Sequence, residues 1–208
     1  MLGTAHLRTT PGKKSPDGSF REYSYSRERI EAIKLQLEDM GYSVVVDYES
    51  PEPLPEWTAK RDKYGYVAEQ KEELRHRVKV VNSYCGKGKQ VVYVSIHTDA
   101  MSGDGFWHTA SGFSVRVSPN ASKKSRKLAK IFTDRARKMN MLGNRCVPKE
   151  GYWEQNLYVL NYTKCPAVLT ETGFQDNKRE IAWLLSNAGK HMVERLHVEA
   201  IAEFCESL

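Results

Sequence analysis

Short, almost wholly apolar runs separated by stretches with helical spacing constrain the fold of this chain most. Residues 91–96 and 166–169 are apolar nearly throughout, as strands buried on both faces of a parallel sheet are. Residues 24–40 carry Ile30 and Ile33 on one face of an expected helix. This alternation predicts an α/β fold, with a single twisted, mainly parallel sheet and helices on both faces. Since no composition shift marks a boundary, residues 1–208 are expected to form one domain.

The composition is that of a globular protein. Of the 208 residues, 40% are hydrophobic and 28% are charged, which is unlike a disordered or fibrous chain. No apolar run approaches the roughly 20 residues that a membrane-spanning helix needs, so we expect no membrane insertion. The start of the sequence has no basic region followed by an apolar core, so no signal peptide is visible and we expect synthesis in the cytoplasm.

The positive charge is concentrated in one segment. The net charge is +6, yet residues 122–149 contain ten Lys or Arg residues and one acid, Asp134, so the rest of the chain is slightly acidic. Such a segment suits nucleic acid, an anionic cell surface or simple exposure to water. Aromatic side chains are not interleaved with these charges as base-stacking platforms would require, so we expect no nucleic-acid partner.

Residues 49–65 are rich in proline and are expected to form a loop. Pro51, Pro53 and Pro55 stand at alternate positions, and proline disrupts the interior of helices and strands. Long loops in compact domains are commonly functional, so this one is a candidate lid or rim of a site.

Four polar residues stand where an α/β sheet places its sites. His97 and Glu171 each follow an apolar run, while His6 and Glu22 lie near the start of the chain. His, Glu and His form a usual zinc-ligand set, and a separate carboxylate can act as general base. Each residue also has a structural explanation: a hydrogen-bonded loop histidine, a glutamate at a helix N-terminus, or a surface ion pair. Taken one by one, the residues do not decide between these alternatives.

Four motifs, in order along the chain, carry a family resemblance. They are His6 with TPGKKSP at 10–16, then Glu22, then SIHTDA at 95–100, then CPAVLTETGF at 165–174 with Asn177. Together they resemble the zinc-dependent N-acetylmuramoyl-L-alanine amidases, and more narrowly the type-3 amidase domain of bacterial autolysins and phage endolysins. The resemblance runs over essentially the whole chain. It implies a phosphorylase/hydrolase-like sheet and hydrolysis of the amide between N-acetylmuramic acid and L-alanine in peptidoglycan.

The resemblance also implies roles for single residues. His6, Glu22 and His97 match the family's ligands for one zinc ion per chain, and Glu171 matches its catalytic glutamate, which activates the zinc-bound water. Two departures concern the first ligand. The family's Gly-His-Gly is Ala5-His6-Leu7 here, and only five residues precede His6 where the family has a first strand. A different local turn and a very short or missing first strand are therefore expected.

Aromatic residues near the expected site are candidate substrate contacts. Trp107 and His108 lie in a glycine-rich loop, and Trp153 lies in a second loop. Their rings suit a sugar or a stem peptide, and they suit packing against the core equally well.

Two alternative functions remain open: one differs from the amidase in the bond that is cleaved, and the other is not an enzyme. One is another zinc peptidase or amidase acting on the peptidoglycan stem peptide, and a second is a non-catalytic wall-binding module. The presence of all three ligands together with Glu171 argues against the module. We expect the protein to act at the bacterial cell wall. It would reach the wall either by release like that of a phage or prophage endolysin, or as an autolysin whose first segment is missing from this sequence. Residues 122–149 would then face an anionic wall surface.

Overall fold

A computed structural model describes residues 1–86 and 88–208. Its strands are β1 (Leu2–Thr4), β2 (Tyr93–Asp99), β3 (Ser114–Val117), β4 (Trp153–Glu154) and β5 (Ala167–Phe174). Its helices are α1 (Glu22–Asp39), α2 (Pro55–Tyr64), α3 (Tyr66–Tyr84), α4 (Lys123–Lys138), α5 (Tyr158–Tyr162), α6 (Lys178–Leu185) and α7 (Asn187–Glu206). Among these residues, no helix is both long and apolar enough to cross a membrane.

The strands form one mixed sheet in the order β1-β2-β5-β3-β4. Neighbouring strands run parallel except for β3 and β5, which are antiparallel. The prediction of a single, mainly parallel sheet is therefore confirmed. The short β1 pairs with β2 from Leu2 opposite Val94 to Thr4 opposite Ile96, so the first strand exists but has only three residues.

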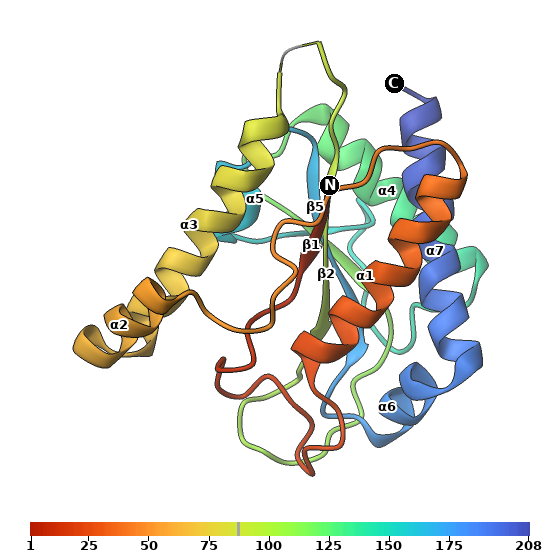
Figure 1. The fold of residues 1–208 in the computed structure, drawn as a ribbon. Coiled ribbons are helices and arrows are strands. Elements are labelled where there is room, and N and C mark those ends of the chain that lie inside the picture. The colour runs from red at the N-terminus through yellow and green to blue at the C-terminus, as the bar shows by residue number, and fades with distance from the viewer. Residues whose placement is uncertain (87) are drawn as a thin grey trace.

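Helices cover both faces of the sheet, as predicted (Figure 1). Helices α1, α4, α6 and α7 pack over one face, and α3 and α5 lie against the other. Alternate residues of the central strands divide between the two layers: Val94 and Val168 join the larger core, while Tyr93 and Leu169 join the smaller one. Because both faces of β2 and β5 are buried, their sequences are apolar at nearly every position.

The expected loop over residues 49–65 is wrong over residues 55–64, which form α2. Pro55 stands at the start of this helix, where the missing N–H of proline would have no intrahelical partner in any case. Trp57 is buried, with its ring centroid 5.1 Å from that of Tyr48 and 5.2 Å from that of His76. This tertiary packing stabilises a helix that the proline pattern conceals.

A buried polar cluster joins β1 to α3. Arg77 donates to Oδ1 of Asp47 over 2.7 Å and to Oγ1 of Thr4 over 2.8 Å, and all three residues are buried. The hydroxyl of Tyr93 donates to Oδ2 of the same aspartate over 2.9 Å. A side chain at Gly3 would overlap the Tyr93 ring, because an added Cβ would lie 2.2 Å from its hydroxyl. The end of β1 is thus held firmly just before the chain reaches His6.

The basic segment, residues 122–149, begins with α4. Ser122 caps this helix by accepting from the N–H of Ser125 over 3.1 Å, and buried side chains such as Phe132 face the core. Arg126 and Arg135 form ion pairs with acidic residues of β4 and α7. Part of the positive charge is therefore neutralised by other parts of the fold.

Candidate metal centre

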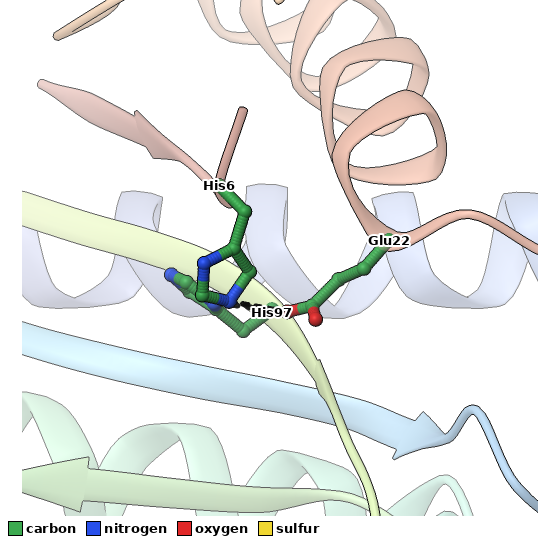
Figure 2. A group of neighbouring side chains, drawn as sticks. All are labelled: His6, Glu22 and His97. Carbon is green, nitrogen blue, oxygen red and sulfur yellow. Dashed lines mark hydrogen bonds and ion pairs between the residues drawn. The ribbon is translucent and has the colours of Figure 1, made fainter. Parts of the chain in front are cut away.

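Three side chains from separate parts of the chain meet at one edge of the sheet. His6 follows β1, Glu22 begins α1, and His97 lies near the end of β2. Figure 2 shows the three side chains pointing toward one another. Nδ1 of His97 lies 3.0 Å from Oε1 of Glu22, and Nε2 of His6 lies 3.5 Å from the same oxygen. One potential ligand atom from each residue lies within 4.8 Å of the other two.

Burial and mutual contacts set the charge states of Glu22 and His97. The Glu22 side chain is 1% exposed, and the two histidines are 16% and 14% exposed. Burial raises the pKa of Glu22, but His6 and His97 outweigh it and hold the pKa well below its usual range. Burial also lowers the pKa of His97 to about 4. At neutral pH, therefore, Glu22 is a carboxylate and His97 is a neutral imidazole, which are the forms that bind a metal.

The donor set and its hydrogen bonds suit a zinc ion. Oε2 of Glu22 is buried and has no hydrogen-bond partner among the described residues, and an unpaired carboxylate oxygen is costly unless a cation neutralises it. Nε2 of His97 lies 3.1 Å from Oγ of Ser95, a second contact of the kind that orients metal-binding imidazoles. Two imidazoles and one carboxylate match the protein ligands of catalytic zinc sites.

The backbone at His6 has an unusual conformation. His6 has a φ of 40°, in the left-handed region that residues with a Cβ seldom occupy. This is the turn that carries the Ala5-His6-Leu7 departure from the family's Gly-His-Gly. The N–H of Leu7 donates to Oγ1 of Thr10 over 3.1 Å, which closes this turn.

Glu171 lies opposite His97 in the register of β5 and β2. Both residues lie inside their strands, because backbone pairing continues beyond the apolar runs from which the strands were predicted. The Glu171 side chain is 12% exposed, and its Oε2 has no hydrogen-bond partner among the described residues. Burial first, and then the negative charge of Asp99, raises its pKa to about 8, while Arg116 opposes the shift.

Two arginines beside Glu171 are not among the residues predicted from the sequence. Arg116 donates to Oδ2 of Asp99 over 2.5 Å, and its Nε lies 3.5 Å from Oε1 of Glu171. Arg145 donates to the same Asp99 oxygen over 2.9 Å. An arginine between two valines of strand β3 was the available signal, since such a charge needs a partner when it is buried.

The three aromatic candidates lie in different surroundings. Trp153 stands opposite Arg116 in the register of β4 and β3, and the Arg145 guanidinium lies 5.8 Å from the centre of its ring. Trp107 packs against the larger core, and His108 pairs with Asp104 over 3.0 Å. Trp153 is therefore linked to the surroundings of Glu171, whereas the described contacts of Trp107 and His108 are with other residues.

Comparison with known proteins identifies the family. The family model described as N-acetylmuramoyl-L-alanine amidase matches residues 1–203. The chain belongs to this amidase family. The family predicted from the sequence is thereby confirmed, and its members are enzymes.

Two curated relatives of the amidase family are moderately similar. The germination-specific N-acetylmuramoyl-L-alanine amidase of Bacillus subtilis (strain 168) is 27% identical over 180 residues, which span 84% of this chain and 68% of that protein. The endolysin of Bacillus phage SPP1 is 30% identical over 131 residues, or 63% of this chain and 45% of the endolysin. The match therefore spans less than half of the endolysin's length.

Solved amidase structures share the fold. The CwlD amidase from Clostridioides difficile, solved in complex with the GerS lipoprotein, has a TM-score of 0.82 at 18% identity, covering 100% of this chain and 98% of that one. The catalytic domain of CwlV, an N-acetylmuramoyl-L-alanine amidase from Bacillus (Paenibacillus) polymyxa var. colistinus, has a TM-score of 0.74 at 19% identity, covering 99% and 96%. The predicted amidase-like α/β fold is thereby confirmed.

Proposed function

We propose that this chain is a zinc-dependent N-acetylmuramoyl-L-alanine amidase that cleaves the amide between N-acetylmuramic acid and L-alanine in peptidoglycan. The convergence of His6, Glu22 and His97 beside the buried Glu171, in a chain of the amidase family, is the observation that carries the proposal. Residues 1–208 would act as one catalytic domain.

The three converging residues would hold one zinc ion. Glu22 supplies a carboxylate and His97 a neutral nitrogen at neutral pH, and the imidazole of His6 is the third donor. When bound, zinc polarises the scissile carbonyl and lowers the pKa of a coordinated water to about 7.

Glu171 would transfer the proton. Its buried Oε2, which has no hydrogen-bond partner among the described residues, would accept a proton from the attacking water as the new C–O bond forms. The same carboxyl then donates that proton to the alanine nitrogen as the C–N bond breaks. A pKa raised toward neutrality suits both steps, because the group must gain and lose the proton at one pH. The products are a lactyl carboxylate on the sugar and a peptide with a free L-alanine amino group.

The arginines beside Glu171 would keep its carboxyl in place. Asp99 accepts from both Arg116 and Arg145, so the Arg116 guanidinium is fixed where its Nε faces Glu171. Within this trio, Asp99 raises the pKa of Glu171 and Arg116 partly offsets that rise. Trp153, next to Arg116 across the sheet, is the aromatic residue best placed to contact substrate, and Trp107 and His108 are weaker candidates.

A protein that cleaves peptidoglycan would act at the bacterial cell wall. The named relatives include a germination-specific amidase and an endolysin, so either an autolysin or an endolysin role agrees with the family. The exposed lysines at the start of α4 would face the anionic wall.

Mass spectrometry of peptidoglycan digested by the protein, with and without a chelator, tests the substrate, the bond and the metal together. Cleavage within the stem peptide would instead indicate the alternative peptidase.

Variants separate metal binding from proton transfer. We expect His97→Ala to lose bound zinc in elemental analysis. Glu171→Gln should retain zinc and lose about 10²–10⁴-fold in kcat, the usual contribution of a general acid–base group. Near-normal turnover of Glu171→Gln, or unchanged zinc content of His97→Ala, would contradict these assignments.

A further inference from the structure

The first two turns of α1 contact the chain segments that carry both histidines. Ser26 lies one turn after Glu22 on the same helix and is 1% exposed. Its Oγ accepts from the N–H of Ala5 over 2.9 Å and donates to the carbonyl of Ile96 over 2.7 Å. Ala5 immediately precedes His6, and Ile96 immediately precedes His97. A single hydroxyl therefore joins the residues before the two histidines.

Arg27, the next residue of α1, contacts the turn that contains His6. Its Nη1 donates to the carbonyls of Ala5, His6 and Tyr23, each over 2.9 Å. Its Nε and Nη2 donate to the carbonyls of Glu49 and Ser50 over 3.0 and 2.8 Å. One guanidinium thus connects the His6 turn, the start of α1 and the segment before α2.

These contacts act on the strained residue of the site. His6 has a left-handed φ of 40° and is flanked by Ala5 and Leu7 rather than by glycines, so this conformation costs free energy. Ser26 holds the N–H of Ala5, and Arg27 holds the carbonyls of Ala5 and His6. Three consecutive peptide groups around His6 are therefore fixed by hydrogen bonds from α1.

We propose that Ser26 and Arg27 are positioning residues for the metal centre, and that they hold His6 and His97 in register with Glu22 before zinc binds. The proposal rests on the ligand set in the proposed function. Since α1 also carries Glu22, this one helix sets the relative positions of all three ligands. Outer contacts that orient ligands raise metal affinity about 10–100-fold, so loss of the Ser26 hydroxyl should weaken zinc binding by that factor.

A matched serine elsewhere in the fold provides the control. Ser125, on α4, is buried, and its Oγ accepts from the N–H of Ala167 over 3.1 Å, at the start of β5 rather than at its metal-centre end. Each hydroxyl has two hydrogen-bond partners: Ser26→Ala deletes the bonds to Ala5 and Ile96, and Ser125→Ala deletes the bond to Ala167 and the contact with the Ser122 hydroxyl. Chelator competition measures the zinc Kd of each variant, and visible absorption of the cobalt-substituted protein reports the coordination geometry.

We expect Ser26→Ala to raise the zinc Kd about 10–100-fold and to alter the cobalt spectrum, while Ser125→Ala leaves both unchanged at a similar loss of Tm. Arg27→Lys, which offers fewer donors, should act in the same direction as Ser26→Ala and serves if that variant does not fold. Equal zinc affinity and identical spectra in wild type, Ser26→Ala and Arg27→Lys would overturn the positioning role alone. Absence of zinc binding by the wild-type protein would overturn the ligand set, and this proposal with it.

Discussion

The buried carboxyl of Glu171 links the stability of the metal-free protein to pH. Burial, and then Asp99, raises its pKa from 4.5 to about 8 in the folded state. Between these two values, the folded protein keeps a proton that the unfolded chain releases. Glu171→Gln replaces the carboxyl with a neutral side chain of nearly the same shape, so the variant loses this dependence on pH.

The sign and size of the effect follow from proton linkage. A raised folded-state pKa stabilises the fold fully below pH 4.5, and this contribution is lost as pH rises through about 8. Each pH unit in that window lowers the free energy of unfolding of the wild type by about 1.4 kcal/mol relative to the variant. From pH 5 to pH 7, Glu171→Gln should therefore gain on the order of 2–3 kcal/mol over the wild type.

Urea unfolding in EDTA at pH 5, 6 and 7 measures this difference. The urea midpoints of wild type and variant should move further apart as pH rises, while the m value of each protein stays the same. Glu31→Gln, at an exposed position of α1, is the control and should follow the wild type. A difference between Glu171→Gln and wild type that stays constant over these pH values, or shrinks as pH rises, would refute the raised pKa.

Three further predictions follow from single contacts. Asp47→Ala removes one of the two carboxylates that pair with the buried Arg77, leaving Glu73, and also takes the acceptor from the Thr4 N–H and the Tyr93 hydroxyl. It should cost about 3–5 kcal/mol of stability in urea unfolding; a loss below 1 kcal/mol would contradict a buried pair. Trp153→Ala should raise KM for muropeptides more than it lowers kcat, and an unchanged KM would remove it from the substrate site. Lys123→Gln combined with Lys124→Gln, at exposed positions of α4, should weaken binding to cell walls at low salt and leave turnover of soluble muropeptides intact. Equal wall binding would assign these charges to solubility.

Much of the architecture was predictable because its determinants are local. The apolar runs that became β2 and β5 are hydrophobic on both faces, and that pattern indicates a covered parallel sheet. The helix predicted over residues 24–40 corresponds to α1 because its apolar spacing matches one buried face. Helix α2 was missed, since its stability comes from the burial of Trp57 against Tyr48 and His76 rather than from its own sequence.

The sequence by itself determined the family motifs, the two central strands and the helix between residues 24 and 40, and the four residues His6, Glu22, His97 and Glu171. Only the tertiary structure decided their surroundings. Asp99 of β2 meets Arg116 of β3 and Arg145 of a distant loop, and Ser26 reaches Ile96 across 70 residues of chain. No local pattern encodes such contacts, because they depend on how distant elements pack. The identity of the reacting groups is thus written in short motifs, whereas their charge states and positions arise from burial and long-range hydrogen bonds.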